Sequence, residues 1–142
     1  MKPLRCLLPV LCTLCLGAAE PVSSRTPVTN FKLPTFTKEG HRSMLLQGTE
    51  ALVGTGRVEL AGMNLTIFTG DARNAVETII LSPAAVADLE SDVISGEDVV
   101  RFIRDDVEIT GSGWRYDHRQ KKVSIARNSR VVFQAQMPDI LK

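Results

Sequence analysis

Two histidines, several carboxylates and scattered serines are the residues of this 142-residue chain whose types suit catalysis or metal binding. His41 and His118 lie 77 residues apart in polar, turn-like stretches, whereas a metal site usually needs three or four convergent ligands. Asp117-His118 and Asp105-Asp106 have acid–base chemistry, but turn formation already favours such residues at both places. We therefore expect no enzymatic centre, no metal site and no cofactor.

Nucleophile and phosphate motifs point the same way. No serine lies in the Gly-x-Ser-x-Gly arrangement of a nucleophile elbow. Gly54-Thr55-Gly56 precedes a strand-like pattern and not a helix, so it lacks the context of a phosphate-binding loop. Without its first 19 residues the chain has 15 Lys and Arg against 16 Asp and Glu. Nucleic acid is therefore not an expected partner, because no basic excess would drive counterion release.

The N-terminus has the pattern of an export signal. Lys2 and Arg5 precede an uncharged stretch from Cys6 to Ala19, which ends in the small residues Gly17-Ala18-Ala19. That stretch has 14 residues, whereas a membrane-spanning helix needs about 20. We therefore expect a signal peptide that is removed after Ala19, and an uncleaved membrane anchor is the alternative.

Cysteine positions and composition divide the chain into four parts. All three cysteines lie in the leader, and leucines precede Cys12 and Cys15 where a lipoprotein site has a small residue. The exported chain is therefore expected to fold without disulfides. The expected parts are a signal peptide (1–19), a flexible linker rich in Pro, Ser and Thr (20–29), one domain (30–136) and a C-terminal tail (137–142).

The domain is expected to be all-β, because short runs of alternating apolar and polar residues are separated by turn residues. The expected strands are 31–33, ended by Pro34, and then 43–47, 57–60, 63–68, 77–81, 99–103, 107–110, 114–116, 123–125 and 131–133. The segment 83–90 fits either one or two helical turns or an extended strand. Strands at this spacing predict a sandwich or a folded-over β-meander.

Apolar side chains recur two residues apart in nearly every expected strand, and side chains two apart share one side of a sheet. The sets are Met44 and Leu46; Val58 and Leu60; Met63, Leu65 and Ile67; Ile79 and Leu81; Val100 and Phe102; Val107 and Ile109; Trp114 and Tyr116; Val123 and Ile125; Val131 and Phe133. A curved sheet around an apolar interior would have this pattern. Trp114 is either an aromatic anchor in a hairpin core or a residue that lines a ligand groove.

The order of these segments resembles the periplasmic lipopolysaccharide-export family LptC/LptA (OstA-like). The segments that carry the likeness are Phe31-Lys32-Leu33-Pro34, Gly40-His41-Arg42, Leu45-Leu46-Gln47-Gly48, Arg57-Val58-Glu59-Leu60 and Met63 to Phe68, followed by Val107 to Gly111, Gly113 to Asp117, Lys122 to Ile125 and Asn128 to Phe133. They cover roughly residues 30–134. LptC members usually keep an N-terminal membrane helix, whereas this leader is of the cleavable kind found in LptA, so both roles stay open.

The resemblance implies a periplasmic, open antiparallel β-jellyroll whose two V-shaped sheets hold the acyl chains of lipopolysaccharide or a similar glycolipid. The implied lipid-binding residues are Leu46, Leu60, Leu65, Ile67, Phe102, Ile109, Trp114, Ile125 and Phe133. It also implies that edge strands pair with other β-jellyroll export proteins, here through Phe31, Leu33, Phe36, Val131 and Val132. Peripheral association with an inner-membrane transporter is a further implied contact. The alternative is a secreted β-sandwich interaction domain with a filled core and no lipid ligand.

Overall fold

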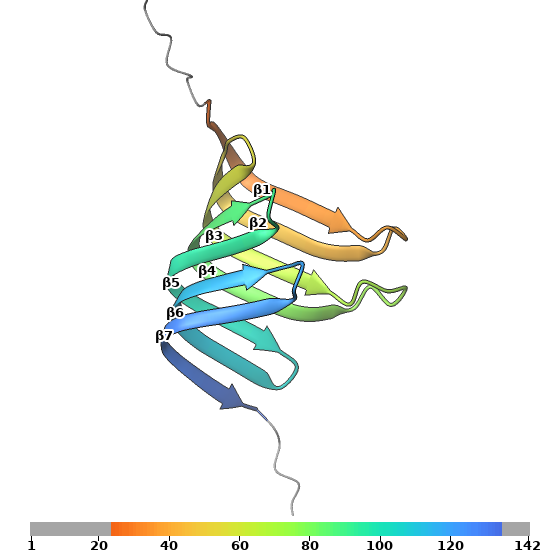
Figure 1. Cartoon of the computed structure of the whole chain (residues 1–142), viewed down its shortest axis with the longest axis vertical. Coiled ribbons are helices and arrows are strands. Elements are labelled where there is room, and N and C mark those ends of the chain that lie inside the picture. The colour runs from red at the N-terminus through yellow and green to blue at the C-terminus, as the bar shows by residue number, and fades with distance from the viewer. Residues whose placement is uncertain (1–23, 135–142) are drawn as a thin grey trace, which may run out of the picture.

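The computed structural model describes residues 24–134, which form seven β-strands (Figure 1). The strands are β1 (Thr26–Phe36), β2 (Arg42–Val53), β3 (Arg57–Phe68), β4 (Val76–Asp88), β5 (Val93–Arg104), β6 (Val107–Asp117) and β7 (Lys122–Phe133). The expected signal peptide and C-terminal tail lie outside the described residues.

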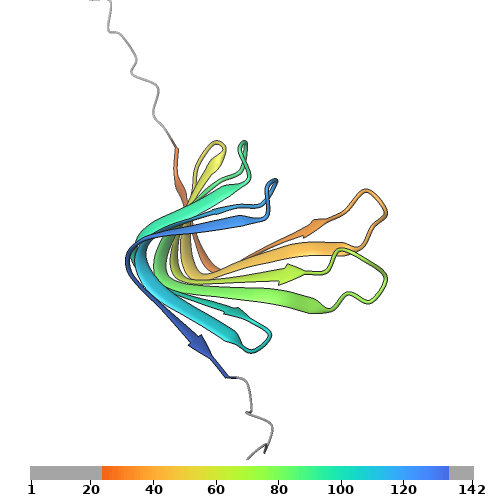
Figure 2. The ribbon, with the colours of Figure 1, turned by 60° about the horizontal axis from the view of Figure 1, so that its bottom comes forward.

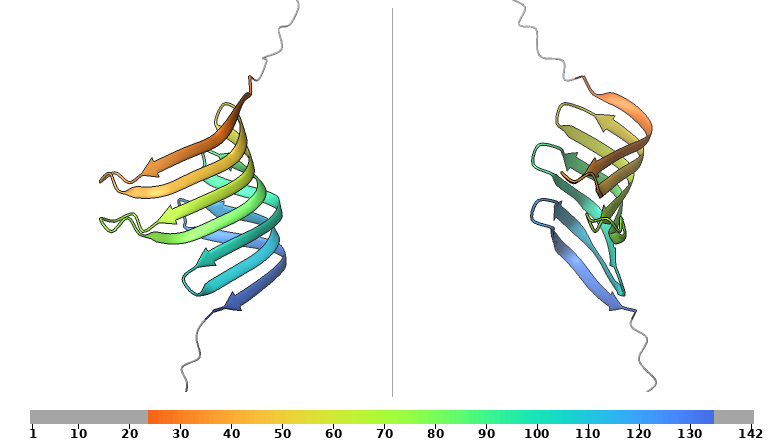
Figure 3. Two further views of the ribbon diagram at one scale, coloured as in Figure 1. Left: turned by 180° about the vertical axis from the view of Figure 1, so that it is seen from behind. Right: turned by 90° about the vertical axis from the view of Figure 1, so that its right-hand side faces the viewer.

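All seven strands belong to one antiparallel sheet in which each strand pairs with its neighbours in sequence. β1 and β7 are the two edges, and Figure 3 shows them at opposite ends of the sheet. The predicted all-β fold with an open sheet is therefore confirmed, and the two layers of the V are halves of a single folded meander.

The sheet folds along a crease that crosses every strand near its middle (Figure 2). The residues at the crease are missing from ladder pairs: Asn30 in β1, Thr49 in β2, Gly62 in β3, Pro83 in β4, Glu97 and Asp98 in β5, Gly113 in β6, and Asn128 and Ser129 in β7. The register shifts there by one residue between β4 and β5, β5 and β6, and β6 and β7, and continues unchanged between the first four strands. Four of these residues have a positive φ, namely Asn30, Gly62, Gly113 and Asn128. The three register shifts are β-bulges, which bend a strand without ending it.

The crease corrects the predicted strand list. Residues 57–60 and 63–68 were expected to be two strands around Gly62, but they are the two halves of β3. The same holds for 107–110 and 114–116 in β6, and for 123–125 and 131–133 in β7. The segment 83–90 is extended through Asp88, so the strand alternative was the right one.

The domain also begins earlier than expected. β1 starts at Thr26, where Thr26 pairs with Val53 and Thr29 with Glu50, so residues 26–29 belong to the sheet and not to a flexible linker. Pro34 does not end this strand, which continues to Phe36. Proline is tolerated there because β1 is an edge strand, where a missing N–H need not break a ladder bond.

The core lies between the two folded halves of the sheet. Its buried members come mainly from β2, β3, β4 and β6, and include Leu46, Leu65, Ile80, Val58 and Trp114. One predicted face was wrong. Ile79 and Leu81 were assigned to the apolar side, but Ile80 pairs with Leu65 and is fully buried, so Ile79 and Leu81 point outward.

Candidate functional site

The crease divides the sheet into two arms that face each other. Arm A is the half that carries the turns at 37–41, 69–75 and 105–106, and arm B is the half that carries the turns at 54–56, 89–92 and 118–121. Figure 2 shows the two arms diverging from the crease. The space between them is the interior of the domain and the place where most of the predicted lipid-binding residues meet.

An unbroken row of apolar side chains crosses arm A from one edge of the sheet to the other. Each member is the register partner of the next: Leu33, Leu46, Leu65, Ile80, Phe102, Ile109 and Val131. Directly paired residues share one face of a sheet, so these seven side chains all point into the interior. Four of the nine predicted lipid-binding residues belong to this row.

Arm B supplies a second row, Val53, Val58, Ala87, Ile94, Tyr116 and Val123, joined in the same way. Nearer the crease, three larger side chains of arm B lie over glycines of the preceding strand. A Cβ on Gly48 would be 2.8 Å from the side chain of Leu60, and one on Gly96 would be 2.7 Å from Trp114 Nε1. Ile125 lies over Gly111 in the same manner. The glycines therefore let the arms close tightly at the crease.

Exposure changes along the row of arm A. Leu46, Leu65 and Ile80 are 0% exposed, Phe102 and Ile109 are half-buried, and Val131 is 49% exposed. Of the other predicted lipid-binding residues, Leu60, Ile67 and Trp114 are buried, Ile125 is half-buried and Phe133 is 71% exposed. The interior is thus filled in the middle and open towards β7.

The twist of the sheet explains this gradient. Tyr116 and Val123 share a small cleft with Ile67, Thr78 and Phe102. This contact places arm B of β6 and β7 over arm A of β3, β4 and β5. The arms are therefore offset along the sheet, as expected from the twist between neighbouring strands. Arm A of β5 to β7 extends beyond this overlap.

A larger hollow lies at the other end of the sheet, on arm B. A cavity of about 670 Å³ lies against the first three strands and is lined by residues 27–29, 50–52 and 59–61. Val28, Ala51 and Leu60 are its members from the interior face. On the inner face of arm B at this end, Ala51, Val58 and Leu60 are buried and only Val28 and Val53 are half-buried, so this end is less open than the β7 end.

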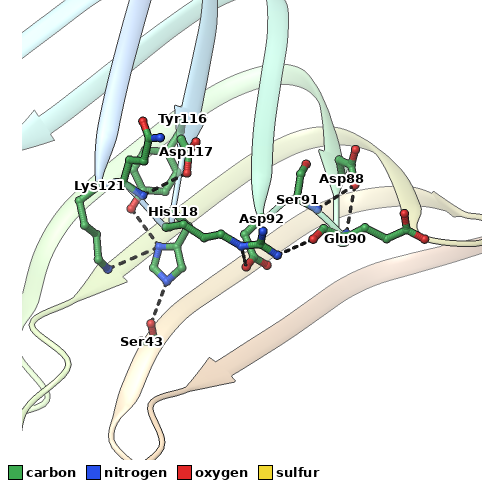
Figure 4. A network of polar contacts seen from close by, with 11 residues as sticks. Ser43, Asp88, Glu90, Ser91, Asp92, Tyr116, Asp117, His118 and Lys121 are labelled. Atoms are coloured by element: carbon green, nitrogen blue, oxygen red, sulfur yellow. Dashed lines mark hydrogen bonds and ion pairs between the residues drawn. The ribbon is translucent and has the colours of Figure 1, made fainter.

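A polar bridge joins the arms far from the crease (Figure 4). Ser43 Oγ, on β2 of arm A, is 2.9 Å from Nε2 of His118, which lies in the β6–β7 turn of arm B. The other ring nitrogen, Nδ1, is 3.0 Å from the Tyr116 hydroxyl and 3.5 Å from Lys121 Nζ. Burial lowers the pKa of His118, and the Lys121 ammonium lowers it further, whereas Asp92 and Asp117 act in the opposite direction.

Sequence reasoning placed His118 in a turn but missed its contact with Ser43. Ser43 is the extra residue of a β-bulge, since Thr35 pairs with Met44 and Phe36 pairs with Arg42. A bulge re-aims a side chain that strict alternation would place on the other face. No local signal near Ser43 distinguishes this bulge from regular strand.

The remaining candidates for chemistry serve turns. Asp117 accepts a hydrogen bond from the backbone N–H of Gln120, and His41 is held at its backbone by Thr37. Asp105 has a positive φ in the two-residue turn between β5 and β6. The turn interpretation of these residues is confirmed. Between residues 24 and 134, no three His, Asp or Glu side chains are grouped as metal ligands.

The two edge strands differ in their surroundings. In β1, Phe31 and Leu33 pack against the core and Phe36 is exposed. In β7, every residue from Ala126 to Phe133 is exposed, which includes the predicted edge residues Val131 and Val132. The edge residues predicted from the sequence therefore lie on the two unpaired edges of the sheet.

The fold and the site define an open β-meander with an apolar interior that reaches both edges. Residues 24–134 match the family described as "Lipopolysaccharide-assembly, LptC-related". The chain belongs to this family, which confirms the resemblance seen in the sequence, and its role is in lipopolysaccharide transport. No individual curated protein matches the chain. The part of the chain that the structure describes contains no helix of the length and apolarity that a bilayer crossing requires.

Proposed function

We propose that this domain is a non-enzymatic, periplasmic carrier that holds the acyl chains of a glycolipid such as lipopolysaccharide between its two arms. The observation that carries the proposal is the unbroken apolar row from Leu33 on one edge to Val131 on the other. Alkyl chains laid along such a row gain about 25 cal/mol for each Å² of apolar area removed from water.

The accessible part of the interior is the first place where an acyl chain would lie. Phe102, Ile109, Ile125 and Phe133 line this part and are half-buried or exposed. The buried members of the predicted set, Leu46, Leu60, Leu65, Ile67 and Trp114, would contact lipid only after the arms move apart. Lipid passage through the middle therefore requires a change in the separation of the arms.

The two open ends support pairing with other β-jellyroll domains of the export system. At the β7 end arm A lacks a covering arm, and at the β1 end a cavity of about 670 Å³ lies beside the edge strand. A neighbouring domain that continued the sheet would cover arm A at the β7 end or fill the cavity at the β1 end. Its strand would pair with the edge at Phe31, Leu33 and Phe36 or at Val131 and Val132. The apolar interior would then continue from one domain into the next.

Two neighbouring residues of β5 provide a matched test of the lipid proposal. Phe102 points into the interior and Ile103 points outward, and both are half-buried. In titrations with a fluorescent lipid A analogue, Phe102→Asp should weaken saturable binding at least about tenfold, because a carboxylate would have to lose its hydration. Ile103→Asp should leave the affinity within about twofold. Circular dichroism checks that both variants keep the sheet.

Two results would contradict the proposal: unsaturable binding by the unmodified protein, or an equal loss of affinity in both variants.

Edge-to-edge pairing is tested separately, by measuring amide exchange at the two edge strands after an LptA-type domain is added. Protection gained at 31–36 or at 129–133 supports edge pairing, and unchanged exchange at both edges rejects it.

The filled middle of the interior favours a second candidate, a protein-interaction domain without a lipid ligand. Leu46, Leu65 and Ile80 are already shielded from solvent by the protein itself. In this case edge pairing would persist while the lipid A analogue showed no saturable binding. The two measurements above therefore separate the candidates.

A further inference from the structure

The hydrogen bond between Ser43 and His118 connects two parts of the chain that the crease alone would leave free to separate. Ser43 lies near the tip of arm A and His118 near the tip of arm B. A contact at the tips resists opening more effectively than one at the crease, because it acts at the greatest distance from the fold line. Figure 4 shows Ser43 below the His118 ring, on the side opposite Tyr116.

The partners of the ring determine which nitrogen carries the proton. Lys121 Nζ can only donate, and it lies 3.5 Å from Nδ1, on which the Tyr116 hydroxyl also converges. Nδ1 is therefore the acceptor, and Nε2–H donates to Ser43 Oγ. The bridge is satisfied with a neutral imidazole.

We propose that Ser43 and His118 form a latch that keeps the arms closed over the middle of the interior, and that its release exposes the buried apolar residues to an incoming chain. The first half of this inference concerns the protein alone. The second half, lipid admission, rests on the proposed function.

The closed middle is what such a latch would maintain. Directly inside the bridge, Tyr116 and Val123 of arm B meet Ile67, Thr78 and Phe102 of arm A in a cleft of about 30 Å³, too small for an alkyl chain. Tyr116 is itself 2% exposed and hydrogen-bonded to the latch histidine. Opening the latch would therefore free the side chain that closes the cleft.

Protonation of His118 is one way to release the latch. Nε2–H would still face Ser43, but the new proton would be on Nδ1, which could then accept no hydrogen bond from Tyr116 or Lys121. The charged ring would also repel the Lys121 ammonium 3.5 Å away, and this repulsion would drive His118 from its place. Three carboxylates also surround the ring, namely Asp92, Asp117 and Glu77 of β4, and Glu77 faces Lys121 as well. Arg104 pairs with Glu77, and Arg119 pairs with Asp92.

The sign of the pH effect follows from the balance of these groups. Burial and Lys121 outweigh the two aspartates and lower the pKa of His118, so the closed state favours the neutral ring. An opened or unfolded state has the usual pKa of about 6.5. Closure is therefore strongest above that value and weakens as the pH falls below it.

The chain contains its own reporter of the closed state. Its only tryptophan, Trp114, is in the interior and 2% exposed. Acrylamide quenching of its fluorescence measures how often small molecules reach the middle of the interior. Ser43→Ala removes the acceptor of the latch with little change in volume. Thr69→Val is the matched control, because it removes a hydroxyl bond, Thr69 to Asp71, that stays within one loop of arm A.

At pH 7.5 the quenching constant should rise roughly three- to tenfold in Ser43→Ala, as expected for loss of one hydrogen bond, while Thr69→Val matches the unmodified protein. Lowering the pH to about 5 should raise quenching in the unmodified protein and leave Ser43→Ala unchanged. Circular dichroism confirms that the sheet persists throughout. Equal quenching in all three proteins, or an acid response that survives in Ser43→Ala, overturns the latch.

Association of a fluorescent lipid A analogue then tests admission. Ser43→Ala should bind it faster by a similar factor, with Thr69→Val again unchanged. Increased quenching without lipid binding by any variant would keep the latch and reject the lipid function. Increased quenching with binding at an unchanged rate would show that lipid enters elsewhere and would reject the latch as its gate.

Discussion

The same apolar row crosses the sheet from β2 to β4 and on to β7. Its residues on β2 to β4 form a packed core, whereas those near β7 are accessible to solvent. Leu65 and Ile80 are fully buried, whereas Val131, in the same row, is half exposed. Composition does not cause the difference, because both sides present large aliphatic residues. The cause is the offset between the arms, which places arm B over β3 to β5 and leaves the last part of arm A uncovered.

The domain therefore has a packed core on one side and leaves apolar side chains exposed to solvent on the other. The packed side supplies the burial that holds the meander together without disulfides between residues 24 and 134. The open side exposes Val131, Val132 and Phe133, which a solitary domain would be expected to cover or replace with charge. The two sides therefore predict different responses to the same substitution.

Truncation of side chains in the apolar row of arm A should give the largest difference in stability between the two sides. Leu65→Ala removes a fully buried side chain and should lower the free energy of unfolding by about 2–5 kcal/mol. Ile109→Ala, at a half-buried place in the same row, should cost only about 1–2 kcal/mol, because little of a cavity remains. Urea denaturation measures both. Equal costs would mean that the β7 side is as well packed as the middle.

Methyl groups added at the crease should be costly on both sides of the sheet, because the contrast in packing disappears where the arms meet. A Cβ on Gly48 would meet Leu60 at 2.8 Å and the backbone oxygen of Glu50 at 3.1 Å, and Leu60 is buried and unable to move aside. Gly48→Ala should therefore cost about 1–3 kcal/mol. Gly111→Ala should cost at least as much, because its Cβ would lie still closer to the Ile125 side chain and 3.0 Å from the backbone oxygen of Arg127.

A double-mutant cycle tests whether Gly48 is needed for the close approach of Leu60 at the crease. Shortening Leu60 to Val in the Gly48→Ala background should recover part of the lost stability, since the two sites are in contact. Additive losses in this double-mutant cycle would show that Gly48 is needed for its backbone and not for the close approach of Leu60.

The two ends of the row form a third, smaller comparison. Leu33 packs against the core from the β1 edge, whereas Val131 is exposed at the β7 edge. Leu33→Ala should lower the free energy of unfolding by about 1–2 kcal/mol, and Val131→Ala should change it by less than about 0.5 kcal/mol. Thermal unfolding of the two variants gives the answer. A loss at Val131 as large as that at Leu33 would mean that β7 is already covered in solution.

Much of the fold could be predicted from the sequence because alternation is a local property. The paired spacing of residues such as Val58 and Leu60 identified strand positions and their inner face correctly. The open, all-β architecture and the family followed from the order of these segments. The interior position of Trp114 and Tyr116 was also visible in their spacing.

What the sequence concealed depends on pairing between strands. Gly62 and Pro83 are typical of turns, and only the continuous register on both sides of them shows that each lies within one strand. In Ile79-Ile80-Leu81 all three residues are apolar, so alternation could not indicate which of them faces inward. The offset of the arms, the filled middle and the bulge at Ser43 arise from twist and register, which short sequence patterns do not encode.

Acid should affect the loop 69–75 of arm A and the tips of the arms at different pH values, and this is the smallest effect we expect. The loop 69–75 is held by Asp71, whose side chain accepts hydrogen bonds from Arg73 and Thr69. The Arg73 guanidinium and the Thr69 hydroxyl lower the pKa of Asp71 to about 2. The loop contacts are therefore present above the usual aspartate pKa and are lost only as the pH falls through about 2. The same loop fixes β2, because Asn74 Oδ1 accepts a hydrogen bond from the Arg42 N–H.

The latch at His118 weakens as the pH falls below about 6.5, so a window should exist between that value and about 2 in which the arms have opened and the loop is intact. Amide exchange at Arg73 should stay slow in that window while Trp114 becomes accessible to acrylamide. Asp71→Asn should accelerate exchange at Arg73 at neutral pH without changing Trp114 quenching, since the hydrogen bonds of the Asp71 side chain go to Thr69 and Arg73 and not to Ser43 or His118. If both regions lost protection at the same pH, acid would be unfolding the domain as a whole, and the distinction between a rigid packed side and a movable opening would have to be abandoned.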